Sequence, residues 1–169
     1  METSVKSLKL PLFDGKPEKF QVWWTRFKAY ASVFSFSQAI KPGGEEHLPE
    51  SEFEELDETT ETGKKKIEAK KRNTVAMANL TMALTTNNAL SIVYKSMNDE
   101  WPGGLAYKVI EDMLERFQPH DIISKAELRR MLGKVSMKKK DDPATLFEQI
   151  SMIENRYNTS ERKVHEEIW

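Results

Sequence analysis

The chain has 169 residues with 26 Lys plus Arg, 27 Asp plus Glu and no cysteine, so its formal net charge is −1. The length allows a substantial core, while the lack of cysteine excludes a disulfide framework, a zinc finger and a thiol nucleophile. A net charge near zero argues against a protein that simply coats nucleic acid. With only 7 glycines and 7 prolines, the composition favours helices over a many-stranded sheet.

The N-terminal residues contain no apolar signal segment. No apolar run approaches the roughly 20 residues that a membrane span requires. We therefore expect an intracellular, soluble protein that makes no contact with a membrane.

The first third of the chain predicts an extended arm followed by an aromatic helix. Apolar residues alternate over 8–12, which is typical of an extended segment, and Asp14-Gly15 is a turn signal. Aromatic and apolar side chains then recur at three- and four-residue steps, which predicts a helix over 17–39.

Trp23 and Trp24 are neighbours on that helix and lie about 100° apart around its axis. Both cannot point toward one core, so we expect one of them at the edge of the buried face. An exposed Trp there would be a candidate contact for another subunit.

Charge changes sign in the middle of the chain. The acidic stretch 45–61 predicts a loop or a short helix that is partly mobile, and a basic stretch then opens a helix over 63–85. Asn87 and Asn88 are expected to cap a third helix through Met97. A Trp-Pro-Gly-Gly loop at 101–104 separates it from a fourth helix over 106–117.

Two further helices are predicted after Pro119, which is the best candidate for a subdomain boundary. Asp121 is expected to cap the fifth helix, and Asp142-Pro143 to begin the sixth. Thr159 or Ser160 would cap a seventh helix that is incomplete at the end of the chain. The predicted fold class is all-α, with six or seven helices.

No catalytic constellation is recognisable. The three histidines, His47, His120 and His165, lie far apart in polar stretches, and the chain lacks a phosphate loop, a serine elbow and an aspartic-protease triplet. The carboxylates of 45–61 lie in a stretch too polar to raise a carboxylate pKa by desolvation. We expect a protein that is not an enzyme and holds no metal or cofactor.

A basic segment on the fifth helix is a candidate RNA contact. Its cations spread around the whole polar side of the helix, so a solvated helix face is the alternative. The candidates, set against Glu127 alone, are Lys125, Arg129, Arg130, Lys134, Lys138, Lys139 and Lys140.

The order of several motifs is more specific than any one of them. Leu-Pro-Leu-Phe-Asp-Gly at 10–15 precedes a helix that carries Trp23 and Trp24. Far downstream, Ala-Glu-Leu-Arg-Arg-Met-Leu at 126–132 lies on a second helix. Met137-Lys138, a polar turn and an amphipathic helix over 146–157 complete the pattern. This order resembles the Gag polyprotein of copia-type LTR retrotransposons over about residues 8–165. The motif and expected core residues are Phe13, Asp14, Gly15, Trp23, Trp24, Phe27, Leu114, Phe117, Leu128, Leu132, Met137, Leu146, Phe147, Ile150, Ile153 and Tyr157.

Two features depart from the family pattern. The family usually has a Trp at the start of the fourth helix, where Tyr107 or Val109 stands here, while Trp101 lies upstream. The acidic-then-basic stretch looks like a lineage-specific insertion at about 42–66.

The resemblance implies a structural capsid protein. An N-terminal capsid-type helical domain would span 1–118, and 119–169 would be the first part of a C-terminal capsid-type domain. Copies would self-associate into a virus-like shell that packages the element's RNA, mainly through a zinc knuckle downstream. The alternative is a domesticated Gag-like module that holds a host peptide in a groove lined by the aromatic residues of the first helix.

Overall fold

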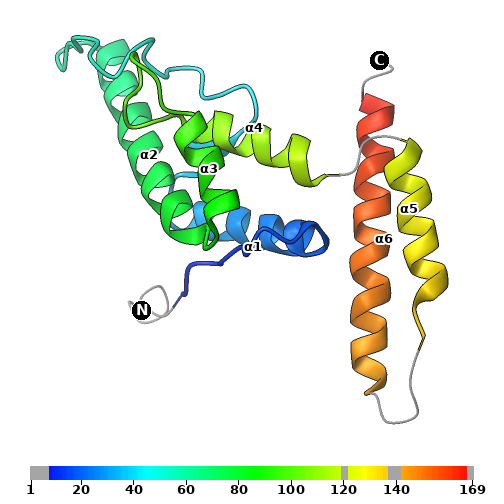
Figure 1. Ribbon diagram of the computed structural model, residues 1–169. Coiled ribbons are helices and arrows are strands. Elements are labelled where there is room, and N and C mark those ends of the chain that lie inside the picture. Colours follow the sequence, from blue (N-terminus) through cyan, green and yellow to red (C-terminus); the bar gives the residue numbers. More distant parts are fainter. Residues whose placement is uncertain (1–7, 119–121, 137–141, 167–169) are drawn as a thin grey trace. The chain divides into compact units, whose positions relative to one another are not determined.

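The computed structural model describes residues 8–118, 122–136 and 142–166 (Figure 1). These residues form helices joined by loops and contain no β-strand, which confirms the all-α prediction. The only strand-like pairing among them is an isolated parallel bridge between Phe13 and Leu84. The elements are η2 (Pro17–Lys19), α1 (Phe20–Val33), η3 (Ser37–Ile40), α2 (Glu61–Ala83), α3 (Asn87–Lys95), α4 (Ala106–Phe117), α5 (Ile122–Lys134) and α6 (Pro143–Glu166).

The chain divides into two compact units. The N-terminal unit comprises Met1–Gly15 and Trp23–Met113, and the C-terminal unit comprises Lys16–Val22 and Leu114–Trp169. The sequence predicted a boundary between residues 118 and 119. The second unit instead begins at Leu114 and also includes the short segment 16–22. Pro119 and Asp121, the predicted hinge and cap, lie outside the described residues.

The N-terminal unit is built on an aromatic cluster around α1. The Trp23 ring lies 5.2 Å from the Phe13 ring and 4.9 Å from the Phe27 ring, measured between centroids. The indole N–H of Trp23 donates to the carbonyl oxygen of Pro11 at 3.1 Å, so the extended arm lies against α1. The arm is also held at Phe13, whose backbone N–H donates to the carbonyl of Ala83 at the end of α2.

We expected one of the two neighbouring tryptophans at the edge of the buried face, but neither of them is exposed. Trp23 is 4% exposed and Trp24 is 8% exposed. A single buried stripe would leave one of the two at its edge, but the arm at residues 11–13 covers the Trp23 side as well. The ammonium of Lys28 lies over the Trp24 ring at 5.3 Å from its centroid, a cation–π distance.

The first helix is also shorter than the predicted 17–39. It ends at Val33, and Ser35 adopts a left-handed φ of 60°. The break lets Phe36 turn back, so that its N–H donates to the carbonyl of Ala31 and its ring is fully buried against Phe27. Burial of one large aromatic side chain outweighs the strain of one left-handed residue.

One predicted cap is wrong and one is confirmed. Thr86, not Asn87 or Asn88, caps α3 by accepting a hydrogen bond from the backbone N–H of Ala89. Asp142 does cap α6, because its carboxylate accepts from the N–H of Ala144 at 3.0 Å, with Pro143 as the first helical residue.

The seventh helix is also not observed, because α6 continues through Thr159 and Ser160 to Glu166. Ser and Thr favour helix starts but cost less than about 0.7 kcal/mol inside a helix, so they do not break one.

The C-terminal unit is held by α5 and α6, which lie side by side and run antiparallel (Figure 1). Leu128 on α5 is 2% exposed and Ile153 on α6 is 8% exposed, so these two positions mark the facing sides of the pair. The turn η2 contacts α6, and Phe20 stacks on Phe117 with 5.5 Å between ring centroids.

Candidate functional site

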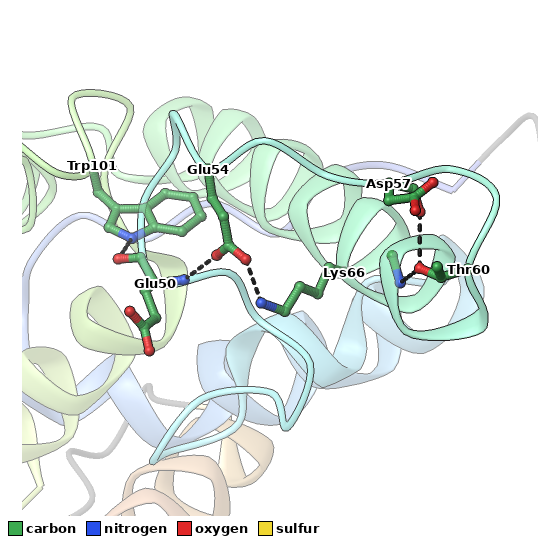
Figure 2. A network of polar contacts seen from close by, with 7 residues as sticks. Glu50, Glu54, Asp57, Thr60, Lys66 and Trp101 are labelled. Carbon is green, nitrogen blue, oxygen red and sulfur yellow. Dashed lines mark hydrogen bonds and ion pairs between the residues drawn. The ribbon is translucent and has the colours of Figure 1, made fainter.

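The polar loop between η3 and α2 carries carboxylates for which the sequence predicted no catalytic role, and several of them make structural contacts. The Glu54 carboxylate pairs with the ammonium of Lys66 on α2 and accepts from the backbone N–H of Glu50 at 2.9 Å (Figure 2). The Lys66 hydrogen bond is the main reason that the pKa of Glu54 lies below its ordinary value. The Trp101 indole N–H donates to the carbonyl of Glu50 at 3.1 Å, so the loop is tied to the residues before α4 (Figure 2).

The same loop makes a second set of contacts with α2. The Arg72 guanidinium pairs with Glu45, whose side chain is only 5% exposed, and the Glu45 carboxylate is the main cause that raises the pKa of Arg72. The ammonium of Lys70 donates to the carbonyl oxygen of Glu52 at 2.6 Å. The acidic loop, which the sequence predicted to be partly mobile, is therefore joined to the basic side chains of α2 by two ion pairs and one hydrogen bond.

The start of α2 is fixed by the end of this loop. Thr60 caps the helix by accepting from the N–H of Gly63 at 3.0 Å, and its own hydroxyl donates to the carbonyl of Asp57 (Figure 2). Hydrogen bonds from Thr59, first of all from its hydroxyl, lower the pKa of Asp57. These hydrogen bonds fix the turn that begins α2.

Asn73 on α2 is a buried polar residue that sequence reasoning missed. Its side-chain amide donates to the carbonyl of Gly104 at 3.0 Å, and its side-chain oxygen accepts from the N–H of Ala106 at 2.9 Å. Asn73 therefore caps α4 from a different helix and is 4% exposed. The only signal in the sequence was an Asn within an otherwise apolar helical stripe, which gives no partner.

In the part of the chain that the structure describes, no group of three or more His, Asp or Glu could hold a metal ion. His47 is half-buried, and the side chains of His120 and His165 lie outside the described residues. No helix in the described ranges is long and apolar enough to cross a membrane.

The α5–α6 pair exposes apolar side chains that the sequence placed in the core. Phe147 on α6 is 65% exposed and Leu132 on α5 is 39% exposed, so their assignment to the core is wrong. At about 100° per residue, Phe147 lies about 120° to one side of Ile153, and Leu132 lies about 40° to the same side of Leu128. Rotations of the same sense on two facing antiparallel helices lead to the same flank. Phe147 and Leu132 therefore share one flank of the pair.

The opposite flank carries an apolar pocket. Its volume is about 370 Å³, and Glu18 of η2 contributes to its wall together with residues of α5 and α6. Met131 and Met152 lie about 60° and 100° to the other side of Leu128 and Ile153, respectively, which places the pocket away from Phe147. The remaining lining residues are Lys134, Val135, Ser136, Gln149 and Ile153.

The structure describes the side chains of three of the seven cations in the basic segment. Arg129, Arg130 and Lys134 are exposed, and the Arg130 guanidinium donates to the Glu127 carboxylate at 3.0 Å. This contact lowers the pKa of Glu127 and raises that of Arg130. The remaining four candidates lie outside the described residues, Lys125 by its side chain and Lys138, Lys139 and Lys140 entirely.

The other motif residues are distributed over both units. Gly15 has a φ of 82°, a left-handed conformation that favours glycine, and follows the half-buried Asp14 in the turn after the arm. Leu114, Leu146 and Ile150 are half-buried, while Phe13, Phe27 and Phe117 are buried. Met137 and the side chain of Tyr157 lie outside the described residues.

Comparisons with known proteins give no family for this chain. No family model, no curated protein and no solved structure matches it.

Proposed function

We propose that this chain is the capsid-forming region of a Gag polyprotein from a copia-type LTR retrotransposon. Copies of it self-associate into a virus-like particle in the cytoplasm, and the particle packages the element's RNA for transposition. The motif order from Phe13-Asp14-Gly15 to the helix after Pro143 supports the family, and the all-α fold agrees with it.

One observation carries the proposal beyond resemblance, namely the apolar surface that a single copy leaves uncovered on the α5–α6 pair. Phe147 is largely exposed on one flank, and an apolar pocket lies on the other. Burying a Phe side chain stabilises a contact by about 1.5–3 kcal/mol, and a lattice repeats that contact in every copy. The net charge of −1 adds little repulsion between copies.

RNA is assigned mainly to a region downstream of this chain. Arg130 already pairs with Glu127, so the described part of the basic segment offers few cations for phosphate binding. If the segment itself binds RNA, replacing Lys138, Lys139 and Lys140 with Ala should weaken retention of RNA and reduce its salt dependence. No retention by the intact chain at low salt would exclude direct binding.

The alternative, a peptide-binding module, was built on aromatic residues of the first helix. Trp23 and Trp24 are both buried, so α1 offers no Trp-lined groove. A peptide module would now have to use the α5–α6 pocket and remain monomeric.

The test is the mass of the chain in solution. Light scattering and electron microscopy over a range of protein and salt concentrations should show oligomers that grow with concentration and include rings or shells. A strict monomer at high concentration in varied salt would refute the proposal.

A further inference from the structure

The two apolar features of the α5–α6 pair complement each other, and we infer that copies join head to tail, with Phe147 of one copy seated in the α5–α6 pocket of the next. This inference rests on the proposed self-association and names its contact. Phe147 cannot fill the pocket of its own chain, because the two lie on opposite flanks of the same pair of helices.

The pocket has the size and lining for an aromatic ring. A cavity of about 150 Å³ lined by apolar side chains holds benzene. The α5–α6 pocket, at about 370 Å³, has room for the Phe147 ring and for part of the helix turn that carries it. Met131 and Met152 contribute flexible thioether side chains, which adapt to an entering ring and make favourable contacts with aromatic edges.

Charges around the two features favour one direction of docking. The pocket wall includes Lys134 from α5 and Glu18 from η2. Phe147 is followed by the exposed Glu148, and the exposed Glu154 lies two turns along the same side of α6. These carboxylates are attracted to Lys134 of the next copy and repelled by Glu18 of that copy. The α6 helix of one copy therefore enters the pocket of the next with its acidic residues toward α5 of that next copy.

This contact uses different surfaces on the two copies. Such a heterologous interface leaves one Phe147 side chain, the knob, and one α5–α6 pocket unoccupied at the two ends of every linear row of copies. Association therefore continues into rings or filaments, whereas an isologous contact between two Phe147 side chains would stop at a dimer.

Two complementary variants of the full 169-residue chain test the contact. Phe147→Ser removes the knob and keeps the pocket, while Met152→Glu places a carboxylate in the pocket and keeps the knob. Phe53→Ser is a matched control, because Phe53 is 70% exposed but belongs to the N-terminal unit. Circular dichroism of each variant checks that helix content is unchanged.

We expect each knob or pocket variant alone to be a monomer at concentrations where the unchanged chain and Phe53→Ser form larger oligomers. An equimolar mixture should give a dimer and no larger species, because only one productive contact remains. Lys134→Glu should weaken association at least tenfold, and adding Glu148→Lys and Glu154→Lys to that variant should restore it. Sedimentation velocity measures all of these.

Several results would overturn the inference. If the unchanged chain assembles and Phe147→Ser assembles equally well, the knob is not the contact, although the proposed function survives. If Met152→Glu alone still forms dimers that Phe147→Ser cannot form, the contact is isologous. If the unchanged chain is monomeric throughout, or binds a peptide in the pocket without associating, both the contact and the proposed function fail.

Discussion

Replacing Asn73 with Leu should destabilise the N-terminal unit more than any other change of one polar side chain on α2. The Asn73 side chain satisfies the carbonyl of Gly104 and the N–H of Ala106, and both residues are buried. A leucine of similar size would leave these two backbone groups without a partner.

The structure sets the magnitude. An unsatisfied buried backbone group costs about 1–3 kcal/mol, so two of them cost about 2–6 kcal/mol. A cavity of about 240 Å³, whose lining includes Asn73 and Gly104, gives water access to the site. We therefore expect the lower half of that range, about 2–4 kcal/mol.

Urea unfolding followed by tryptophan fluorescence measures this loss, since Trp23, Trp24 and Trp101 all lie in the N-terminal unit. Trp169→Phe in every variant removes the signal from the C-terminal unit. Asn79→Leu is the matched control, because the Asn79 amide only donates to Val75 of its own helix at an exposed position. A loss below about 1 kcal/mol for Asn73→Leu, or a loss equal to that of the control, would refute the reasoning.

Three other changes test separate parts of the fold. Gly63→Ala should destabilise the chain by about 1–3 kcal/mol in the same urea assay, because the added Cβ would collide with the Asp57 carbonyl. Helix propensity alone predicts a gain of about 1 kcal/mol, so a gain in stability would contradict the collision. The pKa of Glu54 is lowered in the folded chain, so its contribution is present above the ordinary value of 4.5 and lost as pH falls below it. Glu54→Gln should flatten the fall in stability below that pH, and an unchanged slope would count against the Lys66 pair. Leu128→Ala should cost about 2–5 kcal/mol and loosen α5 from α6, measured by thermal loss of helix signal, and a loss under about 1 kcal/mol would place Leu128 outside the core.

Local patterns in the sequence located the helices well. The three- and four-residue spacing of apolar side chains predicted α4 at its observed bounds, and Asp142-Pro143 predicted the start of α6. These features depend on residues within a few turns of each other, so a sequence contains them directly.

Features that depend on distant partners were not predictable in this way. The break at Ser35 exists because Phe36 finds a place against Phe27, and Trp24 is buried although its neighbour Trp23 is buried too. The partners of Asn73 are about thirty residues away, at Gly104 and Ala106. Periodicity carries no information on which distant backbone group a polar side chain will meet.

The exposed apolar surface of the α5–α6 pair also could not be predicted from periodicity. The α6 pattern placed Phe147 in a buried stripe with Leu146 and Ile150, yet one helix partner covers only part of that stripe. A sequence shows how much apolar surface a helix has, and the structure shows how much of it the same chain covers. The uncovered remainder is what points to association.

The proposed shell requires that the chain self-associates, and sedimentation velocity of the unchanged 169-residue chain at increasing concentration measures this. We expect species that grow from monomer to oligomers larger than a dimer, and a shift back to monomer in Phe147→Ser but not in Phe53→Ser. A single monomeric boundary at all concentrations and salt conditions would contradict it.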